Sequence, residues 1–390
     1  MCHELGFLES DSVEFPVEAG LLKRLSRAYG PRLGDVVRSF ASMGSRFYFR
    51  LNGPARERDL ALGEISSRLA PAVKDESLND AAWFAIKEKQ VLERGTRVIA
   101  DKFAAEAVLQ GAHLYARGVR NCSGLRLGSE ASVTDDNGKL AGVGVARQGE
   151  TSILRYHQGV AVEILENRFG LPSLMDTEWF LQGKIHPQSL PAILTCHVLD
   201  PKPGEVIVDM NCAPGGKMSH ICALTCNKAR VIGFDRNERK IEKTRAQLER
   251  TGCAGYQLVA HDSRYADADY SVRPDRILVD PPCTGLGVTP KLSVDATSED
   301  VDSLSAYQRQ FLNAASRMAT KGTRIVYSVC TITREECEDM AAYGIQELGL
   351  ELESAEPFIG SKGEDPQGFT QRFDPDLHGS GFFIARFRKK

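Results

Sequence analysis

The second half of the chain alternates short apolar runs with charged, amphipathic segments. "EVIVDMN", "RVIGFD", "YQLVAHD", "RILVDPPC" and "RIVYSVC" are typical of strands buried on both faces, and "RNERKIEKTRAQLERTG" is typical of a surface helix. "GSGFFIARFRKK" predicts a last strand, and Thr297 with Asp300 predicts a capping box that opens a further helix. Strands that alternate with helices predict a mostly parallel α/β sheet covered on both faces, over residues 186–390.

A glycine loop follows the first of these strands, in "DMNCAPGGK" (209–217). In such a sheet, ligands bind at the carboxyl ends of the strands, where glycines and a helix N-terminus leave backbone N–H groups free. Asp235, Asp262 and Asp280 end the next three strands, so we expect them at the same crevice. The predicted cofactor-binding residues are these three aspartates and the loop residues Asn211, Cys212, Ala213, Pro214, Gly215, Gly216 and Lys217.

The loop differs from the phosphate-binding loop of nucleoside triphosphatases. That loop ends in Gly-Lys-Ser/Thr, whereas here Met218 follows Lys217, and the full dinucleotide fingerprint is also missing. Asp235 lies 19 residues beyond Gly216, a spacing that suits a carboxylate accepting hydrogen bonds from ribose hydroxyls. The loop therefore favours a nucleoside ligand without a triphosphate, and S-adenosylmethionine is such a ligand.

Two cysteines follow neighbouring predicted strands, Cys283 in "DPPCTG" and Cys330 in "YSVCTITREECE". A lone free cysteine is most often a small buried hydrophobic residue. If the two strands are adjacent in the sheet, however, both thiols and Asp280 lie beside the cofactor crevice.

Methylation of cytosine at carbon 5 needs such a set of groups. Carbon 5 becomes nucleophilic only after a thiolate adds to carbon 6, and protonation of ring nitrogen 3 assists that addition. The attacking thiol needs a lowered pKa, and the acid that supports the ring needs a raised pKa. We assign Asp280 as that acid, place Lys217 beside it, and expect the second thiol to assist release of the product.

At these residues the chain closely resembles the Sun-domain (NOL1/NOP2/Sun) family of RNA cytosine carbon-5 methyltransferases. "NCAPGGK", "DPPCTG", "YSVCTITREECE" and "GFFIARF" carry the resemblance, which covers about 187–390. It implies a Rossmann-like class I fold that uses S-adenosylmethionine, with Cys330 as nucleophile and Cys283 as the thiol that assists release. The departures from the family pattern are Asn211-Cys212, Pro281, Val329 and Cys337, and none removes a reacting group.

The first half of the chain divides into two further regions. Residues 1–92 form an α+β segment with many basic residues, which indicate either solvated helix faces or a phosphate-contacting surface. Residues 93–185 consist of short apolar runs broken by turns, among them a hairpin signal at "DNG" (136–138), and predict a small inserted β-barrel. This region looks like a PUA domain, which in one branch of the family holds the CCA end while cytidine 72 of the tRNA acceptor stem is methylated.

Composition limits the remaining possibilities. The chain of 390 residues has a net charge of −3, lacks a long apolar run or signal pattern, and has ten irregularly spaced cysteines. We therefore expect a cytoplasmic monomer with reduced cysteines that binds no membrane. Cys212, Cys222 and Cys226 lack a second pair of ligands at zinc-like spacing even with His220, so we expect no metal.

Three alternatives stay open at this stage. A non-catalytic RNA-docking protein has no need of two active-site thiols, and an rRNA methyltransferase shares the catalytic motifs. A DNA cytosine methyltransferase is disfavoured by Cys330 and by the PUA-like insert, because in that family the nucleophile corresponds to Cys283.

Overall fold

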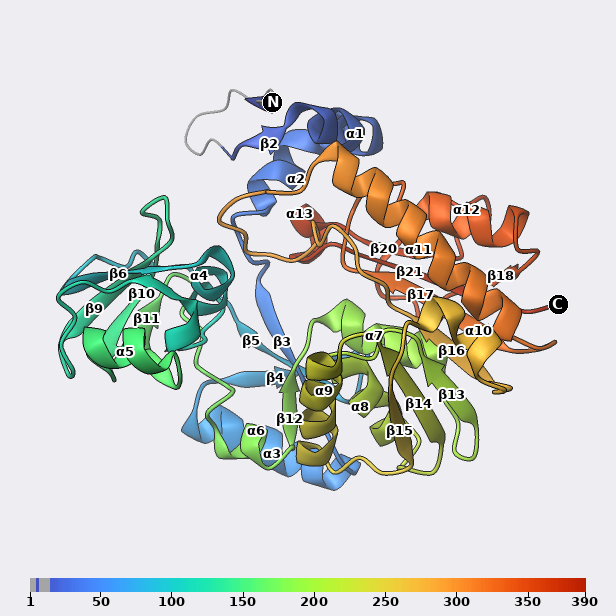
Figure 1. The fold of residues 1–390 in the computed structure, drawn as a ribbon, viewed down its shortest axis with the longest axis horizontal. Coiled ribbons are helices and arrows are strands. Elements are labelled where there is room, and N and C mark those ends of the chain that lie inside the picture. Colours follow the sequence, from blue (N-terminus) through green and yellow to red (C-terminus); the bar gives the residue numbers. More distant parts are fainter. Residues whose placement is uncertain (1–4, 7–14) are drawn as a thin grey trace.

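The computed structural model describes residues 5–6 and 15–390 and has a large mixed sheet at its centre (Figure 1). Five parallel strands are followed by antiparallel ones, in the order β15-β14-β13-β16-β17-β21-β20-β19, while β18 also pairs with β21. Their bounds are β13 Val206–Asp209, β14 Arg230–Asp235, β15 Tyr256–Ala260, β16 Arg276–Val279, β17 Arg324–Val329, β18 Glu351–Glu353, β19 Ser361–Lys362, β20 Gln371–Phe373 and β21 Phe382–Arg388. The predicted five-stranded parallel core and the closing strand are therefore confirmed.

Successive residues of the central strands face opposite layers of helices. Ile277 and Ile325 pack with α11 (Ser298–Met318) and α12 (Glu338–Gln346). Leu278 and Val326 pack on the other face with α7 (Leu190–Leu199), α8 (Gly216–Leu224) and α9 (Glu238–Arg250). Side chains alternate between faces along a strand, so a sheet covered on both sides requires these continuous apolar runs. The predicted Thr297–Asp300 capping box opens α11.

A six-stranded domain is inserted far from the central sheet in the fold, at the left of Figure 1. It consists of β6 (Thr96–Ala100), β7 (Leu114–Tyr115), β8 (Val119–Asn121), β9 (Glu130–Thr134), β10 (Leu140–Ala146) and β11 (Val160–Asn167), with α4 (Lys102–Leu109) and α5 (Glu150–Tyr156). The "DNG" segment joins the antiparallel strands β9 and β10, and Gly138 adopts a positive φ of 78° there. The predicted hairpin is thus confirmed.

The N-terminal segment contacts the predicted catalytic domain, residues 186–390 (the catalytic half), at two places. Its helix α1 (Ala19–Tyr29) lies beside α11, as Figure 1 shows at the top, and α2 (Leu33–Ser39) contacts α13 (Pro375–His378). Helix α1 ends at Tyr29 because Gly30 and Pro31 begin a 3-10 turn that leads into α2. Its strands β3 (Arg46–Leu51), β4 (Ala72–Lys74) and β5 (Ala81–Ala85) form a four-stranded sheet with β12 (Ile185–Pro187), in which β12 pairs with β3. Strand β12 crosses the boundary expected at residues 185/186, and the helices of this segment are α3 (Ala55–Arg68) and α6 (Glu178–Leu181).

Most of the N-terminal basic residues have partners inside the protein. Arg24 forms ion pairs with Asp302 and Glu335, and Arg32 pairs with Asp374 and Asp376. Neither interpretation made from the sequence, solvated helix faces or a phosphate-contacting surface, describes Arg50, because its side chain is fully buried.

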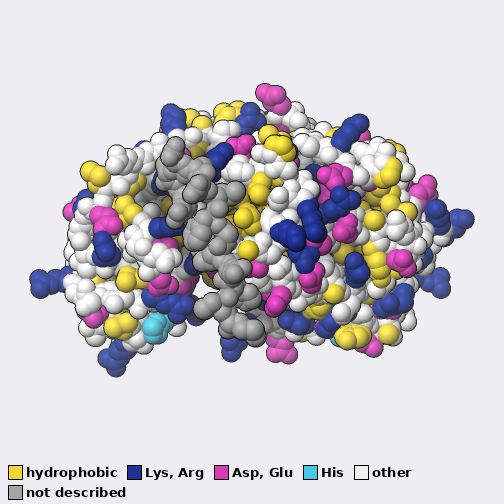
Figure 2. All heavy atoms as spheres, turned by 90° about the horizontal axis from the view of Figure 1, so that it is seen from above, with side chains coloured by type: hydrophobic (Ala, Val, Ile, Leu, Met, Phe, Trp, Pro, Cys, Tyr) yellow, Lys and Arg dark blue, Asp and Glu magenta, His cyan; other side chains and the backbone are white. Residues whose placement is uncertain are grey.

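On the face shown in Figure 2, basic and acidic side chains are interspersed. None of the helices in the described ranges is long and apolar enough to cross a membrane.

Candidate active site

The two predicted thiols lie together at the carboxyl edge of the sheet. β16 and β17 are parallel neighbours with Val279 opposite Tyr327, so the loops that follow them leave the sheet side by side. The Sγ atoms of Cys283 and Cys330 are 3.4 Å apart, and both residues are only partly exposed. The backbone N–H of Gly287 donates to the carbonyl of Cys330 at 3.0 Å, which fixes the two loops to each other.

A buried carboxylate, that of Glu336, accepts hydrogen bonds from both of these loops. Glu336, fully buried, accepts hydrogen bonds from the backbone N–H and the hydroxyl of Thr284, beside Cys283, at 2.9 and 2.6 Å. On the other loop it accepts from the hydroxyls of Thr331 and Thr333 at 3.1 and 2.8 Å. The amide of Gln308 on α11 donates to its second oxygen at 2.9 Å. Glu336 therefore bridges the two loops that carry the thiols.

The hydrogen bond between the thiols differentiates them. It lowers the pKa of Cys330, and the charge of Lys217 lowers it further. Burial and the charge of Asp280 act in the opposite direction and raise the pKa of Cys330. The same bond, with burial, raises the pKa of Cys283 well above its ordinary value. Since only a thiolate is a good nucleophile, the site favours Cys330 as the reactive sulfur and Cys283 as its hydrogen-bond donor.

Asp280 is held on both carboxylate oxygens. Lys217 Nζ lies 2.8 Å from Oδ2, and the Ser328 hydroxyl donates to Oδ1 at 2.7 Å. Burial lowers the pKa of Lys217, but the charge and hydrogen bond of Asp280 outweigh burial and raise it overall. Nearby Asp209, at the end of β13, has its pKa raised to about 7 by burial and by the charge of Asp280. The predicted proximity of Lys217 and Asp280 is present in the structure.

The glycine loop has the shape that a nucleoside cofactor requires. Gly215 has a φ of 101°, a conformation that favours glycine, and it directly precedes α8, whose first N–H groups lack partners within the helix. Asn211 Oδ1 is buried without a hydrogen-bond partner among the described residues, so it is available to a ligand. These residues fit S-adenosylmethionine, whose adenosine and amino-acid groups offer the donors such acceptors need.

Asp235 and Asp262, the acidic residues at the ends of the next two strands, differ in their hydrogen-bond partners. Asp235 ends β14 partly exposed, and its carboxylate accepts the backbone N–H of Asn237 at 2.9 Å. Asp262 lies beyond β15 and forms a bidentate ion pair with Arg264, whose hydrogen bonds lower the pKa of Asp262. Asp235 is therefore ready to accept ribose hydroxyls, whereas Asp262 first has to share its oxygens with Arg264.

A cavity of about 690 Å³ opens beside the thiol loops. Its walls come from the N-terminal segment (Phe47, Tyr48), the inserted domain (Gln110) and the catalytic half (Thr289, Ser380). Neither cysteine lines it, but the Gly381 N–H donates to Gly287, which in turn donates to Cys330. The cavity is thus bounded by all three regions and lies next to the loop that follows Cys283.

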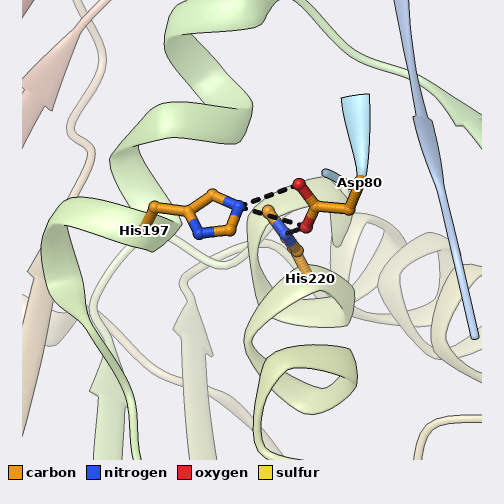
Figure 3. A group of neighbouring side chains, drawn as sticks. All are labelled: Asp80, His197 and His220. Atoms are coloured by element: carbon orange, nitrogen blue, oxygen red, sulfur yellow. Dashed lines mark hydrogen bonds and ion pairs between the residues drawn. The ribbon is translucent and has the colours of Figure 1, made fainter. Parts of the chain in front are cut away.

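A cluster of Asp80, His197 and His220 has the composition of a metal site (Figure 3). The Nε2 atoms of both histidines reach the Asp80 carboxylate, at 2.9 and 2.7 Å. These are hydrogen-bond lengths, whereas ligands of one tetrahedral cation at about 2 Å lie roughly 3.3 Å apart. Burial lowers the pKa of His220 to about 3, so its neutral ring donates to Asp80. We interpret the cluster as a link between the β4–β5 loop, α7 and α8.

Sequence reasoning missed several residues that build the site. Glu336 lies within the quoted cysteine motif, but the sequence predicts no role for it, because its spacing from Cys330 gives no sign of its contacts. Arg50 was counted among the surface bases, yet its guanidinium donates to Gly216 O and Ser219 at the start of α8. A hydrophobic pattern cannot identify a buried arginine, because its partners are distant in sequence.

Comparison with known proteins gives the same assignment. The family model "16S rRNA methyltransferase RsmB/F" matches residues 196–388, and the PUA domain model matches residues 96–166. A tRNA (cytosine(72)-C(5))-methyltransferase of Pyrococcus horikoshii is 36% identical over 91% of this chain and 92% of its own length. The mouse tRNA (cytosine(72)-C(5))-methyltransferase NSUN6 is 30% identical, over 82% of this chain and 76% of its own.

A solved structure agrees over nearly the whole chain. The crystal structure of NSun6 from Pyrococcus horikoshii with SFG superimposes with a TM-score of 0.85 and 34% identity, covering 95% of this chain and 98% of that one. The class I methyltransferase sheet and the PUA domain expected from sequence are thereby confirmed. The chain belongs to the RsmB/F (Sun-domain) family of S-adenosylmethionine-dependent RNA cytosine-5 methyltransferases, in a form that carries a PUA domain.

Proposed function

We propose that the protein is a tRNA (cytosine-5-)-methyltransferase that modifies cytosine 72 of the acceptor stem. The observation that carries the proposal is the 3.4 Å thiol pair opposite the Asp280–Lys217 pair, at the edge of a sheet whose glycine loop fits the cofactor. A docking protein needs none of these groups. The position within the tRNA rests on the two relatives named for cytosine 72.

In the proposed reaction, Cys330 Sγ bonds to carbon 6 of the target cytosine while Asp280, with Lys217 as its proton-bearing partner, supports ring nitrogen 3. S-adenosylmethionine supplies the methyl group to carbon 5. The proton on carbon 5 must then leave, after which the bond between Cys330 and carbon 6 breaks and restores the ring and the thiolate.

Cys283 suits the removal of that proton because its acidity changes during the reaction. Its pKa is raised by the hydrogen bond and the negative charge of Cys330. Once Cys330 is bonded to carbon 6, that charge is gone, and Cys283 loses its proton more easily. The same thiol that donates to the nucleophile at the start is thereby prepared to act as a base at the end.

We propose that the PUA domain binds the CCA end of the tRNA. The 690 Å³ cavity between the three regions is the proposed path of the RNA strand towards the thiols. The target base has to leave its stack to reach the sheet edge, which costs least near the end of a stem. We propose that the protein acts as a monomer, without a metal.

The test is methyl transfer from labelled S-adenosylmethionine into total tRNA, with bisulfite sequencing to locate the product. We expect wild type to label cytosine 72, Cys330→Ala to be inactive, and Cys283→Ala to accumulate a covalent RNA adduct. If Cys283→Ala abolished adduct formation while Cys330→Ala preserved it, the roles would be reversed. Transfer into rRNA alone would reassign the substrate, and binding of tRNA without any transfer would favour a docking protein.

A further inference from the structure

The two thiols at the sheet edge are close enough to bond to each other. Their Sγ atoms are 3.4 Å apart, and they follow strands β16 and β17, which are parallel neighbours. Each sulfur can move by rotation about its own Cα–Cβ bond, so a small rotation of either side chain brings the pair to bonding distance. Both cysteines are partly exposed, so a small reagent in solution can reach them.

The backbone on either side holds the pair together. Each cysteine is followed by a threonine, and the hydroxyls of Thr284 and Thr331 are 2.6 Å apart. Both hydroxyls donate to the buried carboxylate of Glu336, at 2.6 and 3.1 Å. The N–H of Gly287 also donates to the carbonyl of Cys330 at 3.0 Å. A bond between the sulfurs therefore requires movement of the two side chains and no rearrangement of the loops.

The two thiols also differ in the way that a reversible oxidation requires. The hydrogen bond from Cys283 lowers the pKa of Cys330, and the same bond, with burial, raises the pKa of Cys283. A thiolate attacks a peroxide readily, and the sulfenic acid that results condenses with a thiol beside it. Redox-sensing cysteines combine these features: an acidic, accessible thiol next to a second thiol that resolves the sulfenic acid.

We propose that Cys330 and Cys283 form a reversible disulfide when the protein meets a hydroperoxide, and that this bond switches methyl transfer off. The sulfur that would add to carbon 6 and the sulfur that would remove the proton from carbon 5 are then both held in the disulfide. The loss of activity rests on the proposed function, whereas the formation of the bond rests on the geometry of the pair alone.

The oxidation proceeds in two steps. In the first, the Cys330 thiolate attacks one oxygen of the peroxide and the O–O bond breaks, which leaves a sulfenic acid on Cys330 and releases hydroxide, which is protonated to water. In the second, Cys283 Sγ attacks Cys330 Sγ, the S–O bond breaks, and the departing hydroxide takes the proton of Cys283 as a second water. Two electrons pass from the thiols to the peroxide. A dithiol reductant reverses the change by thiol–disulfide exchange.

The test is peptide mass spectrometry of the full-length protein after treatment with hydrogen peroxide, with free thiols blocked by iodoacetamide and the digest kept under non-reducing conditions. We expect peptides that contain Cys283 and Cys330 to be joined, with a mass lower by two hydrogen atoms. Methyl transfer into total tRNA should be lost in proportion to this product and return after dithiothreitol. Oxidation of Cys330 to sulfinic acid without the joined peptide would overturn the inference, and so would a loss of activity that dithiothreitol does not reverse.

Dimedone, which reacts with sulfenic acids, tests the role of the second thiol. In Cys283→Ala the sulfenic acid on Cys330 has no partner, so dimedone should label Cys330 about tenfold more than in wild type. Equal labelling of the two proteins would overturn the role of Cys283. Cys226 is the exposed cysteine among the residues that the structure describes, and Cys226→Ser is the matched control. It should form the joined peptide at the wild-type rate, because exposure alone does not place a second thiol beside the first.

The two measurements separate this inference from the proposed function. Absence of the joined peptide in a protein that methylates tRNA would overturn the inference and leave the function standing. A reduced protein that transfers no methyl group to any RNA would contradict the function, even though the mass of the joined peptide is measured without substrate. Full methyl transfer by protein in which the disulfide is complete would overturn the switch and, with it, the assignment of Cys330 as the nucleophile.

Discussion

Replacing Glu336 tests whether one buried carboxylate sets the distance between the two thiols. The side chain accepts five hydrogen bonds: two from Thr284, one each from Thr331 and Thr333, and one from Gln308. Alanine would remove the acceptor that these buried donors share and create a cavity, although the Thr284 and Thr331 hydroxyls still contact each other. Loss of one member of a buried charged network costs about 3 to 5 kcal/mol. Glutamine keeps one oxygen, and the threonine hydroxyls can turn to accept from its amide, so we expect a cost of about 1 to 2 kcal/mol.

Hydrogen exchange read by mass spectrometry measures this cost locally, on peptides that contain Cys283 and Cys330. With about 1.4 kcal/mol for each factor of ten, Glu336→Ala should lower protection in both peptides by roughly two to three orders of magnitude, and Glu336→Gln by about one. Peptides of the PUA domain serve as internal control and should not change. The rate of methyl transfer should be lowered most in Glu336→Ala and less in Glu336→Gln. Wild-type protection and rate in Glu336→Ala would refute the idea that this network holds the thiols.

Three other predictions follow from the charges at the site. Cys283→Ala removes the hydrogen bond that lowers the pKa of Cys330, so alkylation of Cys330 by iodoacetamide should shift to higher pH; an unchanged profile would contradict the assignment of donor and nucleophile. Asp209, whose folded-state pKa is raised to about 7, contributes stability that is present below its unfolded pKa and lost as pH rises towards 7; Asp209→Asn should therefore gain up to about 4 kcal/mol relative to wild type between pH 4 and pH 7 in urea unfolding of the protein without cofactor. Asp80→Ala leaves two histidine N–H groups unpaired and should destabilise by about 2 to 4 kcal/mol, whereas EDTA or added zinc should leave the melting temperature of wild type unchanged; a zinc-dependent increase would show that the cluster binds metal.

The parts of the fold that could be predicted are those specified by local patterns. Five apolar runs separated by amphipathic helices give the parallel sheet, because strands buried on both faces need continuous apolar residues. The capping box at Thr297 and the turn at Gly138 depend on residues within four positions of each other. The adjacency of β16 and β17, on which the proximity of the thiols depends, was a condition in the sequence argument and is confirmed by the pairing of the strands.

The parts that could not be predicted depend on contacts between distant segments. β12 completes a sheet with strands that precede it by more than 100 residues, and nothing in "IHP" indicates a strand of the N-terminal segment. Arg50 looks like any exposed base, but besides Asn52 its guanidinium donates to residues 188, 216 and 219, which are distant in the sequence. His220 was weighed with nearby cysteines, whereas its partner is Asp80, 140 residues away.

The contacts of the two loops agree with the proposed assignment of Cys330 as the nucleophile and Cys283 as the assisting thiol. A thiol at the end of β17 is followed at once by Thr331, Thr333 and Glu336, which hold the neighbouring loop through Thr284. A thiol at the end of β16 is instead followed by the loop that reaches the PUA domain. The loop after β17, which this network holds in place, suits the attacking sulfur, because nucleophilic attack requires a defined position of the nucleophile. The loop connected to the PUA domain carries Cys283, which agrees with its proposed role after the substrate has bound.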